Sequence, residues 1–442
     1  MTPARRGEAG GREVERRAGR DGLRAALGRT AALAAVDLGA SKVACFIVKP
    51  DGARASDRTV QVAGVGYVQS RGVRAGCVTD VDQAADAIAK AVERAEAVAG
   101  VNVAGVTVAT AAGQLASRRL ASTVALGRGP IAETDLPRAI GAAVAGLKMP
   151  GRRVIHVRPI EWTVDGRGVK DPRGMFGRQL GLRLLLVSID EPVFQTLAHC
   201  VERAHLQFEG VVAAPYASGL ACLEEDETEL GSILVDMGGG STSIAVFSGG
   251  SLVHVDSLAV GGAHVTQDVA RGLSTSMAGA ERIKTLHGSA IASANEDREM
   301  IEAPPRGDDA GAGPVVAPRS LLKGIIAPRV EETFELLRER LKGAPLEPGA
   351  GVVLTGGASQ LAGVRELAVR VFDRPVRLGR PRRTPHLADA ASGPAFCAAA
   401  GVLHRAAFGP REAGLSRTPP KRTAAIEGGA LARAAAWLRD NL

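Results

Sequence analysis

The apolar residues near the start of the chain fall first into short runs and then into a helical repeat. The runs 33–36 and 43–48 flank the polar turn Asp37-Leu38-Gly39-Ala40-Ser41-Lys42, which predicts two strands joined as a hairpin. Residues 62–68 predict a third strand. Residues 82–99 carry apolar side chains three and four positions apart, which predicts an amphipathic helix.

The same alternation of strands and helices continues along the chain and predicts an α/β fold. The expected strands are 101–109, 120–124, 154–162, 182–189, 211–215, 233–235, 244–247 and 352–354. The expected helices are 136–147, 191–204, 216–223, 321–341, one that starts at Leu361, and 431–442. Residues 1–30 predict a flexible extension, 224–229 and 288–320 predict loops, and 406–427 predict a linker.

The opening pattern occurs a second time. A short apolar run leads into Asp236-Met237-Gly238-Gly239-Gly240-Ser241-Thr242, and another apolar run follows, about 200 residues beyond the first such turn. An aspartate at a strand end beside a glycine-rich turn, found twice, indicates two related halves.

Composition narrows the class of protein. The chain has 442 residues, 45% of them hydrophobic, which is enough for large cores. Aromatic residues are only 3%, which argues against stacking platforms for single-stranded nucleic acid, and no nucleic-acid partner is expected. No stretch approaches the ~18 apolar residues of a membrane span. The five cysteines form no CxxC pair, so neither a disulfide framework nor a zinc site is expected.

Positive charge is concentrated in two places within a formal net charge of +8. One is the arginine-rich segment 1–30, and the other is the run 374–383. Either run is a solvated surface or a region attracted to an anionic partner, and the sequence leaves both open.

The two glycine turns are candidates for binding phosphate. Backbone N–H groups in such turns can surround phosphate oxygens without obstruction by side chains. A carboxylate beside phosphate suits a hydrated Mg²⁺, which Asp37 and Asp236 would hold through water. The candidate phosphate-binding residues are Gly39, Ala40, Ser41, Lys42, Gly238, Gly239, Gly240, Ser241 and Thr242.

Two further segments are candidates for the rest of the ligand. The strand 352–354 runs into Thr355-Gly356-Gly357-Ala358 and a helix, where the backbone can approach a ligand closely; plain strand–helix packing is the alternative. Glu281 and Lys284 lie one helical turn apart, either as a surface ion pair or as a pair that grips a ribose or an adenine edge.

These motifs, in this order, resemble the phosphate-1, phosphate-2 and adenosine elements of the actin/Hsp70/sugar-kinase ATPase superfamily. Within it the chain most resembles the FtsA family of bacterial cell-division proteins, over about residues 31–442. The supporting segments are 70–76, 153–157, 280–288, 327–329 and the C-terminal helix. The resemblance implies an actin-like, two-lobed α/β fold that binds ATP with Mg²⁺, and it assigns adenosine contacts to Glu281, Lys284, Gly356, Gly357 and Ala358.

The resemblance also implies a division into subdomains. Subdomain IA comprises 31–81, 177–208 and 385–405, and a small inserted α/β subdomain, IC, comprises 82–176. Subdomain IIA comprises 209–262 and 325–384, and IIB comprises 263–324. The linker 406–427 then leads to a membrane-targeting helix, 428–442.

The function implied is that of an adaptor on the cytoplasmic face of the inner membrane at the division septum. It polymerises with itself, binds the C-terminal peptide of FtsZ and recruits later division proteins. A pilus-assembly ATPase of the PilM type and other actin-fold ATPases or kinases are the alternatives.

Hydrolysis and membrane attachment each depend on a short segment. Residues 213–215 are Ala-Ala-Pro, where readily hydrolysing relatives often carry a residue that orients water, so slow or negligible turnover is expected. In the terminal helix Leu431, Ala435, Leu438 and Leu442 share one stripe with Trp437 at its edge, which predicts an interfacial anchor for an anionic lipid surface. A helix docked on its own protein is the alternative.

Overall fold

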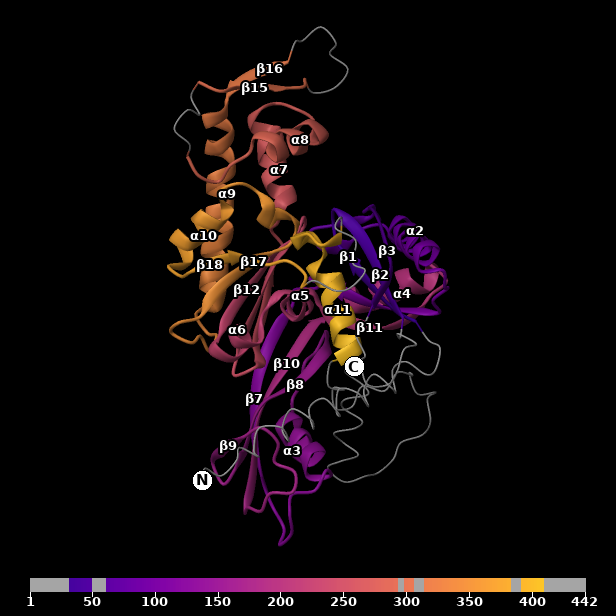
Figure 1. Cartoon of the computed structure of the whole chain (residues 1–442), viewed down its shortest axis with the longest axis vertical. Helices are drawn as coiled ribbons and strands as arrows, with labels where there is room; N and C mark the ends of the chain where they lie inside the picture. The colour runs from indigo at the N-terminus through magenta and orange to yellow at the C-terminus, as the bar shows by residue number, and fades with distance from the viewer. Residues whose placement is uncertain (1–31, 50–60, 293–297, 306–313, 383–390, 409–442) are drawn as a thin grey trace, which may run out of the picture.

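Two β-sheets, each with helices packed against it, form the two lobes of the molecule (Figure 1). A computed structural model describes residues 32–49, 61–292, 298–305, 314–382 and 391–408. The extension 1–30, the linker 406–427 beyond its first residues, and the helix expected over 428–442 lie outside the described residues.

The first sheet has five strands in the order β11-β6-β1-β2-β3. Its strands are β1 (Leu33–Leu38), β2 (Lys42–Lys49), β3 (Gln61–Gln69), β6 (Gly105–Thr110) and β11 (Gln207–Ala213). The first three form an antiparallel meander, which confirms the predicted hairpin and third strand, while β6 runs parallel to β1 and β11 runs parallel to β6.

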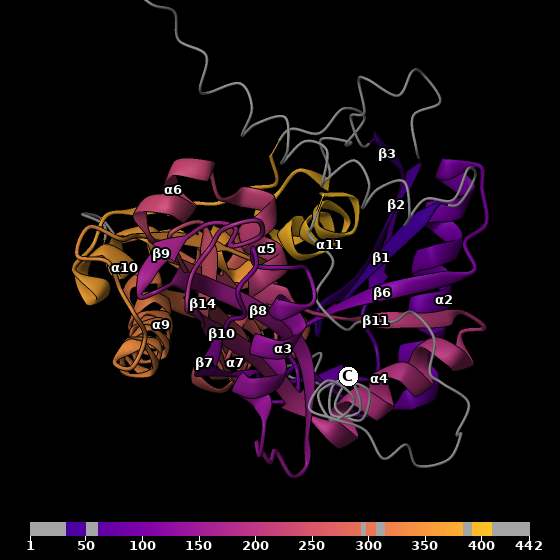
Figure 2. The same cartoon turned by 90° about the horizontal axis from the view of Figure 1, so that it is seen from below.

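Helices α2 (Val81–Ala99) and α4 (Glu191–Arg203) lie on one side of this sheet, and α11 (Cys397–Phe408) lies on the other (Figure 2). Asp80 caps α2 by accepting a hydrogen bond from the Gln83 amide. A Cβ at Gly64 or Gly66 of β3 would fall 2.2 Å from a backbone oxygen of α2. These glycines therefore allow the helix to approach the sheet closely.

The second sheet repeats this order in its first five strands, β18-β17-β12-β13-β14. They are β12 (Ser232–Met237), β13 (Thr242–Ser248), β14 (Ser251–Leu258), β17 (Gly351–Thr355) and β18 (Val376–Leu378). Again three strands form an antiparallel meander, and the fourth and fifth add parallel to the first. The two-fold repeat predicted from the two aspartate–glycine turns is thus a repeat of the whole sheet topology.

Four more strands continue the second sheet beyond β14 and form an insert at the lower end of Figure 1. They are β7 (Ala116–Ala125), β10 (Gln179–Asp190), β8 (Arg152–Val164) and β9 (Arg167–Val169), with α3 (Asp135–Val144) packed on β7 and β10. One backbone pair, Asp256 with Ala116, joins β14 to β7. Behind α3 a separate apolar core forms within the insert.

The insert therefore occupies different residues from the 82–176 expected. Helix α2 and strand β6 belong to the first sheet, because β6 pairs with β1 and α2 packs on β2 and β3. Strand β10 belongs to the insert, although 177–208 was expected in subdomain IA. The insert leaves the first lobe after β6 and returns to it at α4. Strand β11, of which residues 209–213 were expected in IIA, also lies in the first sheet.

The upper part of the second lobe carries α7 (Gly262–Gly272), α8 (Met277–His287) and the hairpin β15 (Met300–Ala303) with β16 (Val315–Pro318), as Figure 1 shows. Helix α9 (Arg319–Leu341) is continuous and packs against α10 (Val364–Phe372) further down the lobe. It therefore crosses the boundary between IIB and IIA that was expected at 324/325. The loop expected over 288–320 is wrong where β15 and β16 pair, because Ile301, Ala303 and Ala317 bury the inner face of that hairpin.

The acidic run 224–229 is helical rather than a loop. Helix α6 (Glu225–Leu230) starts with three acidic residues, and negative charge is favourable at a helix N-terminus. The Glu227 side chain accepts a hydrogen bond from the Glu224 amide at 2.9 Å and pairs with Arg377 of β18 at 2.5 Å. This long-range ion pair was not visible in the local sequence.

The arginine run near β18 is used inside the fold. Arg374 donates to the Ala350 carbonyl at 2.7 Å, and Arg382 donates to the Leu220 carbonyl at 2.9 Å. Together with Arg377, these arginines link the edge of the second sheet to the segments packed beside it.

No helix among the described residues is long and apolar enough to cross a bilayer.

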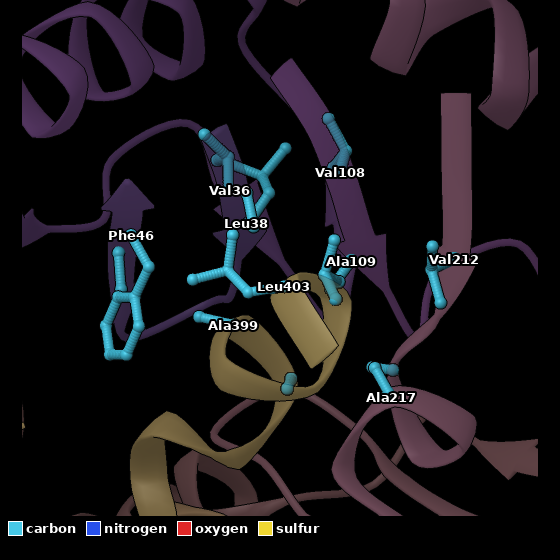
Figure 3. Close-up of a cluster of buried hydrophobic side chains, with 14 of the residues drawn as sticks. Val36, Leu38, Phe46, Val108, Ala109, Val212, Ala217, Ala399 and Leu403 are labelled. Carbon is cyan, nitrogen blue, oxygen red and sulfur yellow. The ribbon is translucent and has the colours of Figure 1, made fainter. Parts of the chain in front are cut away.

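Helices α5 (Ala214–Cys222) and α11 cross between the two sheets (Figure 3). In that view Ala399 and Leu403 of α11 face Leu38 and Phe46 of the first sheet. A Cβ at Gly401 would fall 1.7 Å from the Ala217 carbonyl oxygen, so the two helix backbones touch there. The central core of the molecule therefore depends on a stretch of small residues.

Candidate functional site

The two glycine turns have the same local construction. The Gly39 amide donates to the Lys42 carbonyl at 3.1 Å, and the Gly238 amide donates to the Ser241 carbonyl at 2.9 Å. Each closes the hairpin that follows an aspartate, Asp37 at the end of β1 and Asp236 at the end of β12. The repeated sequence therefore gives a repeated loop.

Folding brings these two turns into direct contact. A Cβ at Gly239 would lie 2.0 Å from the Ser41 Oγ, and a Cβ at Gly240 would lie 2.7 Å from the Ala40 Cβ and from the Gly76 amide. Glycine is thus required here for the close approach of one lobe to the other. The connection to β5 (Cys77–Val78), in which Gly76 lies, forms a third wall beside the turns.

Backbone donors remain free at this junction. The amides of Ala40, Ser41, Gly239 and Gly240 have no hydrogen-bond partner among the described residues. Successive free N–H groups at the ends of two hairpins are the donors that an oligophosphate requires. The chemistry of both turns therefore fits phosphate.

Two carboxylates lie at the base of the junction. Burial raises the pKa of Asp37 to about 6; the Lys42 ammonium opposes that rise and the negative charge of Asp236 adds to it. Burial also raises the pKa of Asp236, against the effects of a hydrogen bond from Ser218 and of the Lys42 charge. The Ser218 hydroxyl donates to Asp236 Oδ2 at 2.6 Å. Two buried carboxylates at one junction fit a divalent cation, whose charge would offset their desolvation.

Lys42 does not point simply into the space between the turns. Its Nζ donates to the Ala395 carbonyl and lies 4.0 Å from the centroid of the Phe396 ring. Burial lowers the pKa of Lys42, while the charges of Asp37 and Asp236 oppose that fall. The glycine-turn motif predicts Lys42 beside phosphate. No local pattern predicts its contacts with Ala395 and Phe396, because they lie about 350 residues further along the chain.

The expected adenosine residues lie on the second lobe around the start of α7. A Cβ at Gly262 would be 3.2 Å from the Ala358 Cβ and 3.8 Å from the Lys284 Nζ. The Lys284 Nζ contacts Glu281 Oε2 at 2.7 Å and the Gly262 carbonyl at 3.2 Å. Glu281 and Lys284 thus form the ion pair that was one of the two alternatives. The pair lies next to the glycine turn at 238–240, which is the position that the other alternative, contact with adenosine, requires.

The loop after β17 closes this wall. A Cβ at Gly356 would lie 2.5 Å from Asp236 Oδ1, and Gly356 has a φ of 84°, which glycine adopts readily. Gly357 begins the 3₁₀ helix η1 (Gly357–Gln360) instead of an α-helix. The structure therefore gathers Asp37, Asp236 and all three glycine segments at one junction. The anchor residues Leu431, Ala435, Trp437, Leu438 and Leu442 lie outside the described residues.

Comparisons with known proteins identify the family. The sequence model described as "Cell division protein FtsA" matches residues 233–401. The cell division protein FtsA of Rhizobium meliloti (strain 1021) is 41% identical over 384 residues, which are 85% of this chain and 87% of that protein. The chain belongs to the FtsA family of cell division proteins. FtsA of Escherichia coli (strain K12) is 32% identical over 91% of this chain and 96% of its own length.

Comparison of this FtsA family chain with solved structures shows which fold it has. The PilM–PilN type IV pilus biogenesis complex has a chain that matches with a TM-score of 0.58 and 16% identity, over 85% of this chain and 98% of that one. MreB5 of Spiroplasma citri bound to ADP matches with a TM-score of 0.51 and 13% identity, over 85% and 96%. The fold is the expected actin-like α/β fold with an inserted domain.

The insert also has a family counterpart. The sequence model described as "SHS2 domain inserted in FTSA" matches residues 112–188. This range falls between β6 and α4, where the strand pairing places the insert. The start of the insert predicted from the sequence, residue 82, is too early. Without the pairing of β6 with β1, the sequence of α2 and β6 is typical of the beginning of a separate α/β module.

Several residues of this site are not predicted by the sequence motifs. Ser218 lies within a short apolar helix and carries no motif, yet it bonds Asp236. Gly261 directly precedes α7 and Gly262 begins it, and the amides of Gly262 and Ala263 donate to the Gly238 and Gly239 carbonyls. The pair of glycines directly after an apolar strand was the available signal for this contact.

The segment expected to lack a water-orienting residue is buried at the end of β11. Ala213 and Ala214 are enclosed in the core, and the Ala213 amide donates to His156 Nε2 at 3.0 Å. His156 is fully buried and its ring meets the Tyr216 ring edge to face, so it packs in the core beside this segment.

Proposed function

We propose that this FtsA family chain binds ATP with Mg²⁺ at the junction of the two glycine turns. The observation that carries the proposal is the convergence of free turn amides with Asp37 and Asp236 from the two halves of the repeat. The turn amides would hold the phosphates, and the two carboxylates would hold the metal through water. Lys284, Glu281 and the loop at Gly356–Ala358 would contact the adenosine.

We propose slow hydrolysis at most. Supporting this, Ala213 and Ala214 offer no side chain that could orient a water molecule. Turnover below the common enzyme range of ~1 s⁻¹ is expected in a phosphate-release assay. Brisk turnover that depends on Mg²⁺ would contradict this expectation and require a base from elsewhere.

We further propose the adaptor role that the family implies: self-association into filaments on the inner face of the membrane, attachment of the FtsZ C-terminal peptide, and recruitment of later division proteins. Family membership and the C-terminal amphipathic pattern support it. A role like that of PilM has fold similarity alone behind it, at 16% identity. A small-molecule kinase would need a carboxylate facing an acceptor, for which the residues at the junction offer no candidate beyond the two aspartates.

The nucleotide site is tested by Asp236→Ala. Removing one charge-assisted contact costs about 1.5–3 kcal/mol, so the affinity for Mg-ATP should fall about 10- to 150-fold. Isothermal titration calorimetry on the full chain measures it, and Asp86→Ala, an exposed change on α2, is the matched control. An Asp236→Ala variant that binds Mg-ATP as the unmodified chain does would exclude this site.

A further inference from the structure

The Lys42 ammonium has an aromatic partner outside the phosphate turn. Its Nζ lies 4.0 Å from the centroid of the Phe396 ring while donating to the Ala395 carbonyl next to it. Both partners belong to the 3₁₀ helix η3 (Pro394–Phe396), just before α11. A cation over an aromatic face is attracted electrostatically, more strongly when both groups are withdrawn from water.

The Phe396 ring is fixed in place by its neighbours. It packs against Phe46 with centroids 6.0 Å apart and against Tyr67 edge to face at 5.6 Å. Phe396 is 8% exposed, so little room remains for the ring to turn. Figure 3 shows Phe46 on the first sheet, facing α11.

Helix η3 is also tied to the second lobe. The Pro394 carbonyl accepts from the Gly356 amide and from the Thr355 hydroxyl, each at 3.2 Å. One short segment therefore holds both the lysine of the first glycine turn and the loop expected to meet adenosine. Its position fixes where the Lys42 charge lies relative to the second lobe.

Burial alone would favour a neutral amine at Lys42. The carbonyl of Ala395, the face of Phe396 and the carboxylates Asp37 and Asp236 all favour the ammonium. Among these, the ring attracts the cation without forming a directional hydrogen bond, so the ammonium keeps donors for a further acceptor.

We propose that Phe396 is a positioning residue that holds the Lys42 ammonium charged beside the phosphate turns and so sets affinity for the phosphate chain of a nucleotide, not for its nucleoside. This inference rests on the proposed ATP site. The competing explanation is that Phe396 is a packing residue only, in which case its loss would affect all ligands alike.

The first test needs no nucleotide. Acetic anhydride labels neutral amines, and mass spectrometry of the digested full chain gives the labelling rate of Lys42 at pH 8. Phe396→Leu should raise that rate about two- to fivefold, the factor that corresponds to a cation–π contact of moderate strength. Phe396→Tyr, which keeps the ring, should retain the original rate. Tyr67→Leu, which removes a half-exposed neighbouring ring while the buried Phe46 still packs against Phe396, should not change it.

The second test uses calorimetry with Mg-ATP and with adenosine. Phe396→Leu should weaken Mg-ATP binding about two- to fivefold and leave adenosine binding unchanged. An unchanged labelling rate, equal losses for both ligands, or the same effects from Tyr67→Leu would each overturn the inference. If the unmodified chain binds no Mg-ATP, the proposed function itself fails; if it binds and Phe396→Leu binds equally well, the inference alone fails.

Discussion

At the scale of single residues, the two aspartates have unlike surroundings despite their repeated sequence. Asp236 accepts a hydrogen bond from Ser218. For Asp37, by contrast, the neighbouring charge with the largest effect on its pKa is the Lys42 ammonium. The aspartates and glycines were predictable because each lies in a local motif. Ser218 and Phe396 were not, because they meet the site only through contacts between elements.

The raised pKa of Asp37 makes ligand-free stability depend on pH. The folded pKa of about 6 lies above the ordinary 3.8, so the folded protein binds this proton more tightly and loses stability as pH rises through that window. At pH 7.5 the penalty is up to about 3 kcal/mol. Asp37→Asn should therefore stabilise the ligand-free chain at pH 7.5 and do so much less at pH 4.5.

Urea unfolding of both chains at the two pH values measures this difference, so that other titrating groups cancel. Asp86→Asn, on the exposed side of α2, serves as the control substitution. A stabilisation by Asp37→Asn of equal size at both pH values would contradict the assigned pKa.

At the scale of elements, most strands and helices follow from periodicity, and the errors share one cause. The acidic segment of α6 and the β15–β16 hairpin lack strong apolar periodicity, so they read as loops. The ion pair between Arg377 and Glu227 stabilises α6, and burial of the Ile301 and Ala303 side chains stabilises β15. Both elements are stabilised by partners that are distant in sequence.

The crossing of α5 and α11 leads to a prediction about Gly401. Alanine there gains about 1 kcal/mol of helix propensity. Its Cβ would, however, meet the Ala217 backbone at 1.7 Å, which no rotamer change relieves, so the net effect should be a loss of about 2 kcal/mol or more.

Gly324 is the matched control, because it lies within α9 and a Cβ there meets nothing within 4 Å. Gly324→Ala should stabilise the chain by about 0.5–1 kcal/mol. Thermal unfolding followed by circular dichroism compares the two. A Gly401→Ala chain as stable as Gly324→Ala would show that the helices do not touch as described.

At the scale of the whole molecule, one topology is used twice and the site lies where the two copies meet. Each sheet by itself supplies one aspartate and one glycine turn. The contacts of Gly239 with Ser41 and of Gly240 with Ala40 exist only when both lobes are in place. Ligand binding at the proposed site is therefore expected to depend on the relative position of the lobes.

Membrane attachment is a prediction about the full chain. Deleting residues 431–442 should leave folding and Mg-ATP binding intact and abolish sedimentation with anionic vesicles, because the helix predicted there from the sequence would carry the apolar stripe. One such short, alanine-rich helix would bind weakly, so the filaments proposed to form with ATP should increase vesicle binding of the intact chain through avidity.

Vesicle co-sedimentation with and without ATP and purified FtsZ measures both effects. Trp437→Glu should reproduce the deletion. If the shortened chain still sediments at physiological salt, the anchor assignment is wrong and the arginine-rich residues 1–30 become the candidate.

The local features can be predicted from the order of residues alone: the aspartate–glycine turns, the strands beside them, the order of the motifs and thereby the superfamily. Those features depend on neighbours in the chain, where backbone conformation and side-chain periodicity are set. Contacts between distant segments define the limits of the insert, the helix at 225–230, and the partners Ser218 and Phe396. These depend on strand pairing, ion pairs and ring contacts between distant segments, whose register no local pattern specifies.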